Sequence, residues 1–152
     1  NIACLVNQTG PLYVHPEGVV RRTHFHAMAM YANLLGPQVA RASVESDRLT
    51  HDGSSVAVVD ALATVDESGQ TWSVAIMNRH PSEEVVCTLQ LGDLPVHGTY
   101  QATILDGSSP DAYNDIEHPD RVVPTATEVT FEAGAVRLPP HSLCIVAVPL
   151  ER

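Results

Sequence analysis

The stretch VAVVDALATVDESGQTWSVAIM, residues 56–77, decides the fold class. Its first part, Val56–Val65, consists almost entirely of Val, Ala and Leu, which is typical of a strand buried on both faces. A short Gly-containing turn follows. After the turn, Trp72, Val74 and Ile76 recur every second residue, so they share one face of a second strand. The stretch therefore predicts two adjacent strands inside a sheet.

The two-residue period continues on both sides of this stretch. Turn pairs that contain Gly separate further strand patterns at Val39–Val44, Glu84–Leu91, Thr99–Leu105, Glu128–Phe131, Ala135–Leu138 and Ser142–Leu150. About eight short strands at this spacing predict an all-β fold, an antiparallel β-sandwich or jelly roll. One stretch, Ser108–Ala126, carries no strand pattern, and loops of that length are usually functional or disordered.

One helix is expected before the strands, at about residues 22–36. We place its N-cap at Thr23, and the positions that recur at helical spacing predict an apolar face of Phe25, Met28, Ala29, Ala32 and Leu35. Met30 and Leu34 widen the apolar surface, so we expect other parts of the protein to pack against more than one side of the helix. Gly36-Pro37 ends it, with Gly36 as a left-handed cap. The apolar segment Asn1–Val6, which has no initiator Met, resembles the last turns of a helix cut from a longer chain.

Composition excludes several classes of function. The formal net charge is −10 over 152 residues, and such an acidic surface repels phosphate backbones, so we expect no nucleic-acid partner. No apolar run approaches the roughly 20 residues that span a bilayer, so we expect no membrane partner. Cys4, Cys87 and Cys144 are far apart in sequence, which favours buried free thiols in a reducing cytosol.

Three groups of residues have the side-chain types that carry chemistry. Gly18, His24 and His26 match the opening of a cupin metal signature, but no Glu follows and the histidines lie where the helix begins. His141 and Ser142 are adjacent and have the residue types of a base and a nucleophile, but we expect the pair to form a turn instead. The acidic residues are expected to be solvated surface groups rather than a glycosidase pair; they are Glu67, Glu83, Glu84, Asp93, Glu117, Asp120 and Glu128. We therefore expect no catalytic residue, metal site or cofactor in this chain.

Four blocks in order resemble the C-terminal part of family 51 glycoside hydrolases, the α-L-arabinofuranosidases. They are NIACLVN at 1–7, GVVRRTHF through YANLLG at 18–36, NDIEHPDRVVP at 114–124 and LPPHSLCIV at 138–146. The resemblance implies a (β/α)8 barrel followed by a jelly roll. Residues 1–36 would be the last strand and helix of the barrel, and residues 37–152 the C-terminal jelly roll.

The resemblance also implies a function for the parent protein. Such enzymes release terminal arabinofuranose by a retaining mechanism, in arabinose and arabinan catabolism, with two glutamates that would lie upstream of Asn1. The fragment itself would be structural and interface-forming, its partner the missing barrel, and arabinofuranoside would bind only to the full-length enzyme. Arg22 occupies the position where family members often place a substrate-binding Gln, so we expect it to contact substrate. We expect a cytoplasmic bacterial protein.

Two alternatives stay open beside this interpretation. An autonomous carbohydrate-binding sandwich would present aromatic side chains for sugar stacking, and Trp72, the one Trp, has a spacing suited to the core. A cupin-like metal-binding protein is the second alternative. Without the barrel, the helix at residues 22–36 would lose its cover, so we expect it either to pack back onto the sandwich or to form a homo-oligomer.

Overall fold

The computed structural model describes residues 4–150 of the chain. Helix α1 covers Thr23–Leu34. The strands are β1 Leu12–His15, β2 Gly18–Arg21, β3 Gln38–Val39, β4 Arg48–His51, β5 Ser54–Ala57, β6 Val59–Val65, β7 Thr71–Asn78, β8 Val85–Thr88, β9 Gln90–Leu91, β10 Leu94–Pro95, β11 Gly98–Leu105, β12 Thr125–Phe131, β13 Ala135–Leu138 and β14 Ser142–Pro149. The predicted all-β class is confirmed, with this helix packed on the strands.

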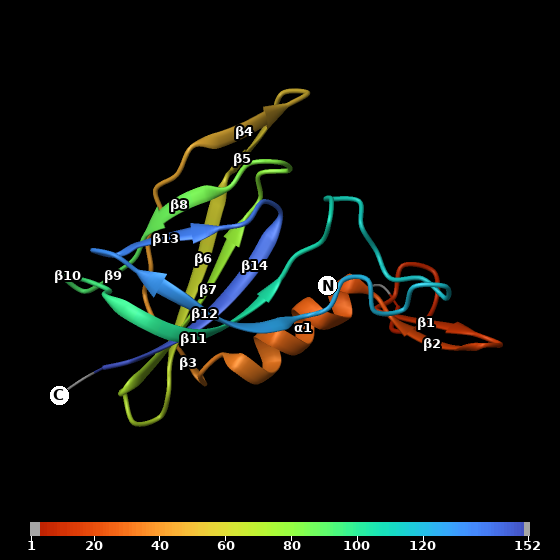
Figure 1. Ribbon diagram of the computed structural model, residues 1–152, viewed down its shortest axis with the longest axis horizontal. Coiled ribbons are helices and arrows are strands. Elements are labelled where there is room, and N and C mark those ends of the chain that lie inside the picture. Colours follow the sequence, from red (N-terminus) through yellow and green to blue (C-terminus); the bar gives the residue numbers. More distant parts are fainter. Residues whose placement is uncertain (1–3, 151–152) are drawn as a thin grey trace.

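The main layer is a six-stranded antiparallel sheet in the order β12-β11-β14-β7-β6-β3 (Figure 1). Its centre is the β7–β14 pair, whose register runs from Ser142 opposite Asn78 to Pro149 opposite Thr71. Both strands are buried along most of their length because layers cover both faces of the sheet. This explains why their sequences are almost continuously apolar.

Alternate residues of the central strands enter two different cores. Val74, Ile76, Cys144 and Val146 point to one side and pack with Phe131, Leu138 and the partly buried residues of β8. The β8–β13 ribbon, paired from Ala135 opposite Thr88 to Leu138 opposite Val85, forms the second layer of the sandwich on that side. The two-residue period therefore predicted this core correctly, including the inward face of Glu84–Leu91.

Helix α1 covers the other face of the sheet. Met30 is 3% exposed and packs with Ala75, Leu143 and Ile145. The helix therefore packs back onto the sandwich, the first of the two outcomes expected for it. The predicted apolar face was wrong in part, however: Leu35 packs against this core, but Met28 is 48% exposed and Ala32 is also exposed. Apolar residues occur on nearly every side of this helix, so their spacing does not select the buried side.

Both predicted ends of the helix need correction. Arg22, with an extended backbone, is the N-cap, and Thr23 is already helical. At the other end, Gly36 is not in the left-handed region, and Leu35 ends the helix in an extended conformation. Gly36 is required for space instead: a Cβ there would lie 2.5 Å from the Val65 carbonyl oxygen.

The N-terminal segment forms a hairpin rather than helical turns. β1 and β2 pair from Leu12 opposite Arg21 to His15 opposite Gly18, so Gly18 begins a strand that the sequence did not reveal. Val6 forms a parallel bridge with Leu12, and Cys4–Val6 is not helical. The rest of the predicted Asn1–Val6 turns lies outside the described residues.

Two predicted strands differ from the structure. The Val39–Val44 strand shrinks to Gln38–Val39, after which residues 40–47 are irregular. The Val56–Val65 run divides into β5 and β6, because β5 turns away to pair with β4 in a separate hairpin. The expectation of one long, doubly buried strand was therefore wrong for its first part, where Val56 is 48% exposed.

The long loop predicted at Ser108–Ala126 is confirmed as residues 106–124. It leaves the end of β11, runs to the β1–β2 hairpin and returns to β12 (Figure 1). Asn114, 3% exposed, fixes it there: its Nδ2 donates to the Arg21 carbonyl at 2.8 Å and to the Val122 carbonyl at 2.9 Å. The loop therefore joins the sandwich to the junction between β2 and α1.

Among residues 4–150, no helix combines the length and apolarity that crossing a bilayer requires. The division at residue 36 remains a prediction.

Candidate functional site

Arg22, the predicted substrate contact, lies at the junction of β2 and α1. Its backbone N–H donates to the Pro11 carbonyl at 2.9 Å. Its Nη1 donates to the carbonyls of Gln8 and Gly10, the latter at 3.2 Å, and its guanidinium lies 5.2 Å from the centre of the Tyr13 ring. The side chain is therefore held in place by the segment before β1. In the part of the chain that the structure describes, its Nε and Nη2 have no hydrogen-bond partner.

The segment that holds Arg22 is itself strained. Asn7 and Gln8 have φ values of 57° and 41°, in the left-handed region that disfavours residues with a side chain. Side-chain and backbone bonds of Asn7 stabilise this geometry, from Val14 N–H to Asn7 Oδ1 and from Asn7 N–H to the Leu12 carbonyl, both at 2.7 Å. Consecutive strained residues held by this many contacts form a preorganised loop beside the guanidinium.

The histidines of the cupin-like pattern lie on α1, where positions i and i+2 point to different sides. His26 is 8% exposed, and its ring packs edge-on against Phe25 at 5.6 Å. Burial lowers the pKa of His26, and the nearby Arg21 charge adds to this effect, while Asp120 opposes it. The described residues contain no group of three or more His, Cys, Asp or Glu placed to hold a metal ion.

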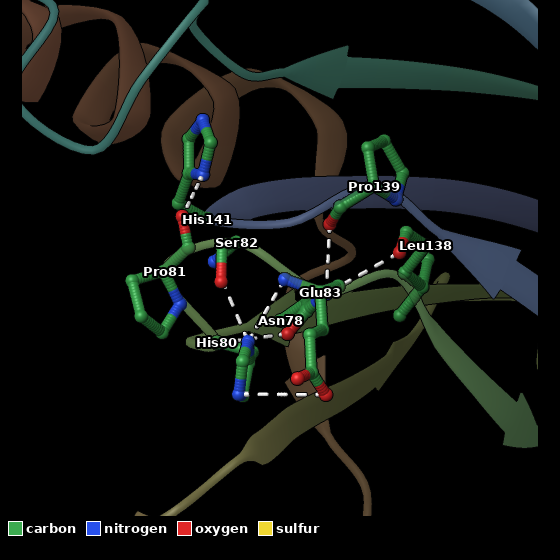
Figure 2. Close-up of polar contacts among 8 residues, drawn as sticks. All are labelled: Asn78, His80, Pro81, Ser82, Glu83, Leu138, Pro139 and His141. Carbon is green, nitrogen blue, oxygen red and sulfur yellow. Dashed lines mark hydrogen bonds and ion pairs between the residues drawn. The ribbon is translucent and has the colours of Figure 1, made fainter.

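A polar network at the end of β7 ties three segments together (Figure 2). The buried Asn78 amide nitrogen donates to the carbonyls of Glu83 and Pro139, both at 2.9 Å, and to that of Leu138 at 3.3 Å. Its Oδ1 accepts the His80 N–H at 2.9 Å. Every Asn78 side-chain polar atom is thus used to fix the β13–β14 turn against the turn after β7.

His141 and Ser142 do not form a base and nucleophile. The two ring nitrogens of His141 lie 3.0 Å from the Pro81 carbonyl and 2.9 Å from the Gly107 carbonyl. The Ser142 hydroxyl donates to the Pro139 carbonyl at 2.7 Å. His141 has a φ of 41° in the turn before β14, so the pair shapes a turn, as the sequence suggested.

The thiols and the candidate acids are likewise in structural surroundings. Burial raises the pKa of Cys144 to about 11 and also raises that of Cys87, so both thiols stay protonated and unreactive at neutral pH. Glu84 pairs with Arg137 at 2.8 Å on the exposed surface. The two thiols are therefore packing groups of the core, and Glu84 is one half of a surface ion pair.

The start of α1 borders a hollow of about 320 Å³. Its floor is apolar, formed by Met77, Leu105 and Leu143, and Thr23 lies on its wall. The Thr23 hydroxyl is buried and has no partner in the described residues. Sequence reasoning missed this hollow, because its lining comes from α1, the ends of three strands and the long loop, which are far apart in the chain.

Comparison with known families and structures identifies the class of protein. A family model described as the alpha-L-arabinofuranosidase C-terminal domain matches residues 1–142. The chain belongs to this family. No curated protein sequence matches the chain.

Solved structures with the same fold include family 51 enzymes. An alpha-L-arabinofuranosidase from Thermotoga maritima, solved as an arabinose complex, superposes with a TM-score of 0.85 at 21% identity, over 99% of this chain and 33% of that one. The GH51 enzyme from Thermotoga petrophila gives 0.85 at 22% identity, over 97% of this chain and 33% of that one. AbfB, a family 51 alpha-L-arabinofuranosidase from Bifidobacterium longum, gives 0.80 at 25% identity, over 97% and 29%. The chain therefore corresponds to the C-terminal region of such enzymes and spans about a third of their length.

Proposed function

We propose that this chain is the C-terminal portion of a cytoplasmic bacterial α-L-arabinofuranosidase that removes terminal arabinofuranose by a retaining double displacement. The single observation that carries the proposal is the match to the arabinofuranosidase C-terminal domain over residues 1–142. The acid and the nucleophile of a retaining glycosidase are two carboxylates about 5–5.5 Å apart. We assign both to the part of the parent protein that this chain does not span.

Within the parent enzyme the sandwich would act as a buttress for the catalytic barrel. The β2–α1 junction is fixed to the sandwich twice, through Met30 on the sheet and through Asn114 on the Arg21 carbonyl. Active sites of (β/α)8 barrels lie at the carboxyl ends of their strands. If β1 continues the last barrel strand, the turn after β1 and the start of α1 border the sugar pocket.

Arg22 would then contact the substrate from a preset position. The Arg22 Nη1 donates to the carbonyls of Gln8 and Gly10. The N–H donors on Nε and Nη2 are therefore left for sugar hydroxyls. A side chain already fixed in its binding geometry loses little entropy when substrate binds. The guanidinium offers donors only, whereas the Gln of other family members also offers an acceptor. This difference predicts a changed preference among arabinosides.

The test uses the full-length parent protein. Hydrolysis of 4-nitrophenyl α-L-arabinofuranoside, with NMR of the first-formed anomer, should show arabinose released with retained configuration. Arg22→Gln should change KM among arabinosides, and Arg22→Ala should lower kcat/KM by about tenfold, the loss expected for one charged hydrogen bond. Arg48→Ala, an exposed arginine on β4 that bonds to Ser55, is the matched control. Release of the inverted anomer, or activity only on other glycosides, would refute the proposal.

A further inference from the structure

The open side of the sandwich holds a cavity that the proposed function does not use. It has a volume of about 540 Å³ and lies between the exposed edges of β6 and β8, with residues 41–43 of the irregular segment on its rim. A neighbouring hollow of about 580 Å³ shares Ser43, Ala61, Thr88 and Leu89 with it. Volumes of 300–1,000 Å³ are those of small-molecule sites. The two hollows together form a groove long enough for more than one ligand unit.

Trp72 lines the first hollow. The sequence placed this residue in the core, but the structure shows it only partly buried: it packs against the core cluster and also forms part of the cavity wall. An indole gives a large, rigid and apolar surface with a polar N–H at its edge. Its position at the border of core and cavity fixes the ring without covering it completely.

The polar groups around Trp72 are hydrogen-bonding rather than acidic. Arg41 and Gln90 line the same hollow together with Ser43 and Thr88, and no Asp or Glu is among its lining residues. Within residues 4–150 the Arg41 guanidinium and the Gln90 amide have no hydrogen-bond partner. In a chain with a net charge of −10, the polar lining of this hollow is therefore neutral or cationic, whereas Glu45 and Asp47 line the neighbouring hollow.

We propose that this groove binds a neutral saccharide. One sugar ring would stack its apolar C–H face on Trp72. Its hydroxyls would accept hydrogen bonds from the Arg41 guanidinium, and they would both donate to and accept from the Gln90 amide. The neighbouring hollow would hold the next sugar unit. Such a site lies on the sandwich and not on the β2–α1 junction, so it would hold a polysaccharide chain rather than take part in hydrolysis.

Trp72 is the only tryptophan of the chain, so all tryptophan emission comes from the wall of this cavity. We expect a linear arabino-oligosaccharide to change the emission of residues 1–152 saturably, with half-saturation on the order of 1 mM. A cello-oligosaccharide tests whether the site selects pentose chains, and either saccharide supports the proposal. Glycerol, which has hydroxyls but no ring to stack, should cause no saturable change.

Variants that keep the reporter complete the test. Arg41→Ala and Gln90→Ala remove exposed side chains, so the fold should persist in both variants. Arg41→Ala should weaken saccharide binding by about tenfold or more, and Gln90→Ala should weaken it by less. Arg48→Ala, outside this cavity, is the control and should bind as the wild type does. The proposal is overturned if no saccharide changes the fluorescence at about ten times the expected half-saturation, if glycerol gives the same change, or if both variants bind like the control. Because this assay needs no hydrolysis, its failure leaves the arabinofuranosidase proposal standing.

Discussion

Replacement of Asn78 by Ala should destabilise the sandwich more than any surface change. Asn78 is 1% exposed, and its amide makes four contacts with backbone groups of β13, the β13–β14 turn and the turn after β7 (Figure 2). The two N–H hydrogens serve three carbonyls, so the network counts as about three full hydrogen bonds. At about 1 kcal/mol net for each bond, the loss is about 3 kcal/mol.

The partners left behind add to that loss. The Leu138 carbonyl lies in the buried region around Asn78, and a buried acceptor without a donor costs about 1–3 kcal/mol unless water enters. We therefore expect the free energy of unfolding to fall by about 3–6 kcal/mol. That is a large part of the total of about 5–15 kcal/mol that a domain has. Asn78→Asp should be at least as damaging, because a carboxylate cannot donate to the three carbonyls.

Urea unfolding followed by circular dichroism measures the effect. The midpoint for Asn78→Ala should fall while the slope stays unchanged, because the substitution hardly changes how much surface unfolding exposes. Asn33→Ala is the matched control: this exposed amide bonds only to the Ala29 carbonyl on the surface of α1, so its loss should stay within about 0.5 kcal/mol. A decrease below about 1 kcal/mol for Asn78→Ala would show that the network does not stabilise the fold as the geometry implies.

Three further predictions concern α1 and the long loop. Gly36→Ala should cost about 1–3 kcal/mol, because its Cβ would meet the Val65 carbonyl oxygen at 2.5 Å; an unchanged urea midpoint would contradict this. The lowered pKa of His26 means that the unfolded chain binds the extra proton more readily, so stability should fall as the pH drops below the ordinary value of 6.5, and His26→Gln should remove that part of the slope between about pH 7.5 and 5.5. Equal pH profiles for the two proteins would argue against it. Asn114→Ala should raise hydrogen exchange in the 106–124 loop and at the β2–α1 junction together, because its amide joins them; a change confined to the loop would disprove the connection.

The sequence predicted the sandwich because its strands obey a local rule. On β7 and β8, side chains two residues apart face the same core, so the inward residues were identified before the structure was known. The predicted strand Val39–Val44 broke the rule: its residues alternate like a strand, but only Gln38 and Val39 find a partner, at the end of β6. Whether an alternating segment joins a sheet depends on a free edge at the right place, which the sequence does not contain.

The side of α1 that is buried, and the surroundings of Arg22, depend on distant residues. Apolar residues surround the helix, so only the sheet beneath it selects Met30 over Met28. Arg22 was expected at the sugar pocket by resemblance alone, and its clamp on Gln8 and Gly10 arises from two residues with positive φ that neither spacing nor propensity marks. The partial exposure of Trp72 also depends on how the 40–47 segment leaves the sheet.

The most direct test of the account compares hydrolysis of 4-nitrophenyl α-L-arabinofuranoside by residues 1–152 alone and by the full-length parent protein at equal concentration. We expect turnover by the parent and none above background by the isolated chain, because the two catalytic carboxylates are assigned to the part this chain does not span. Hydrolysis by the isolated chain would contradict it.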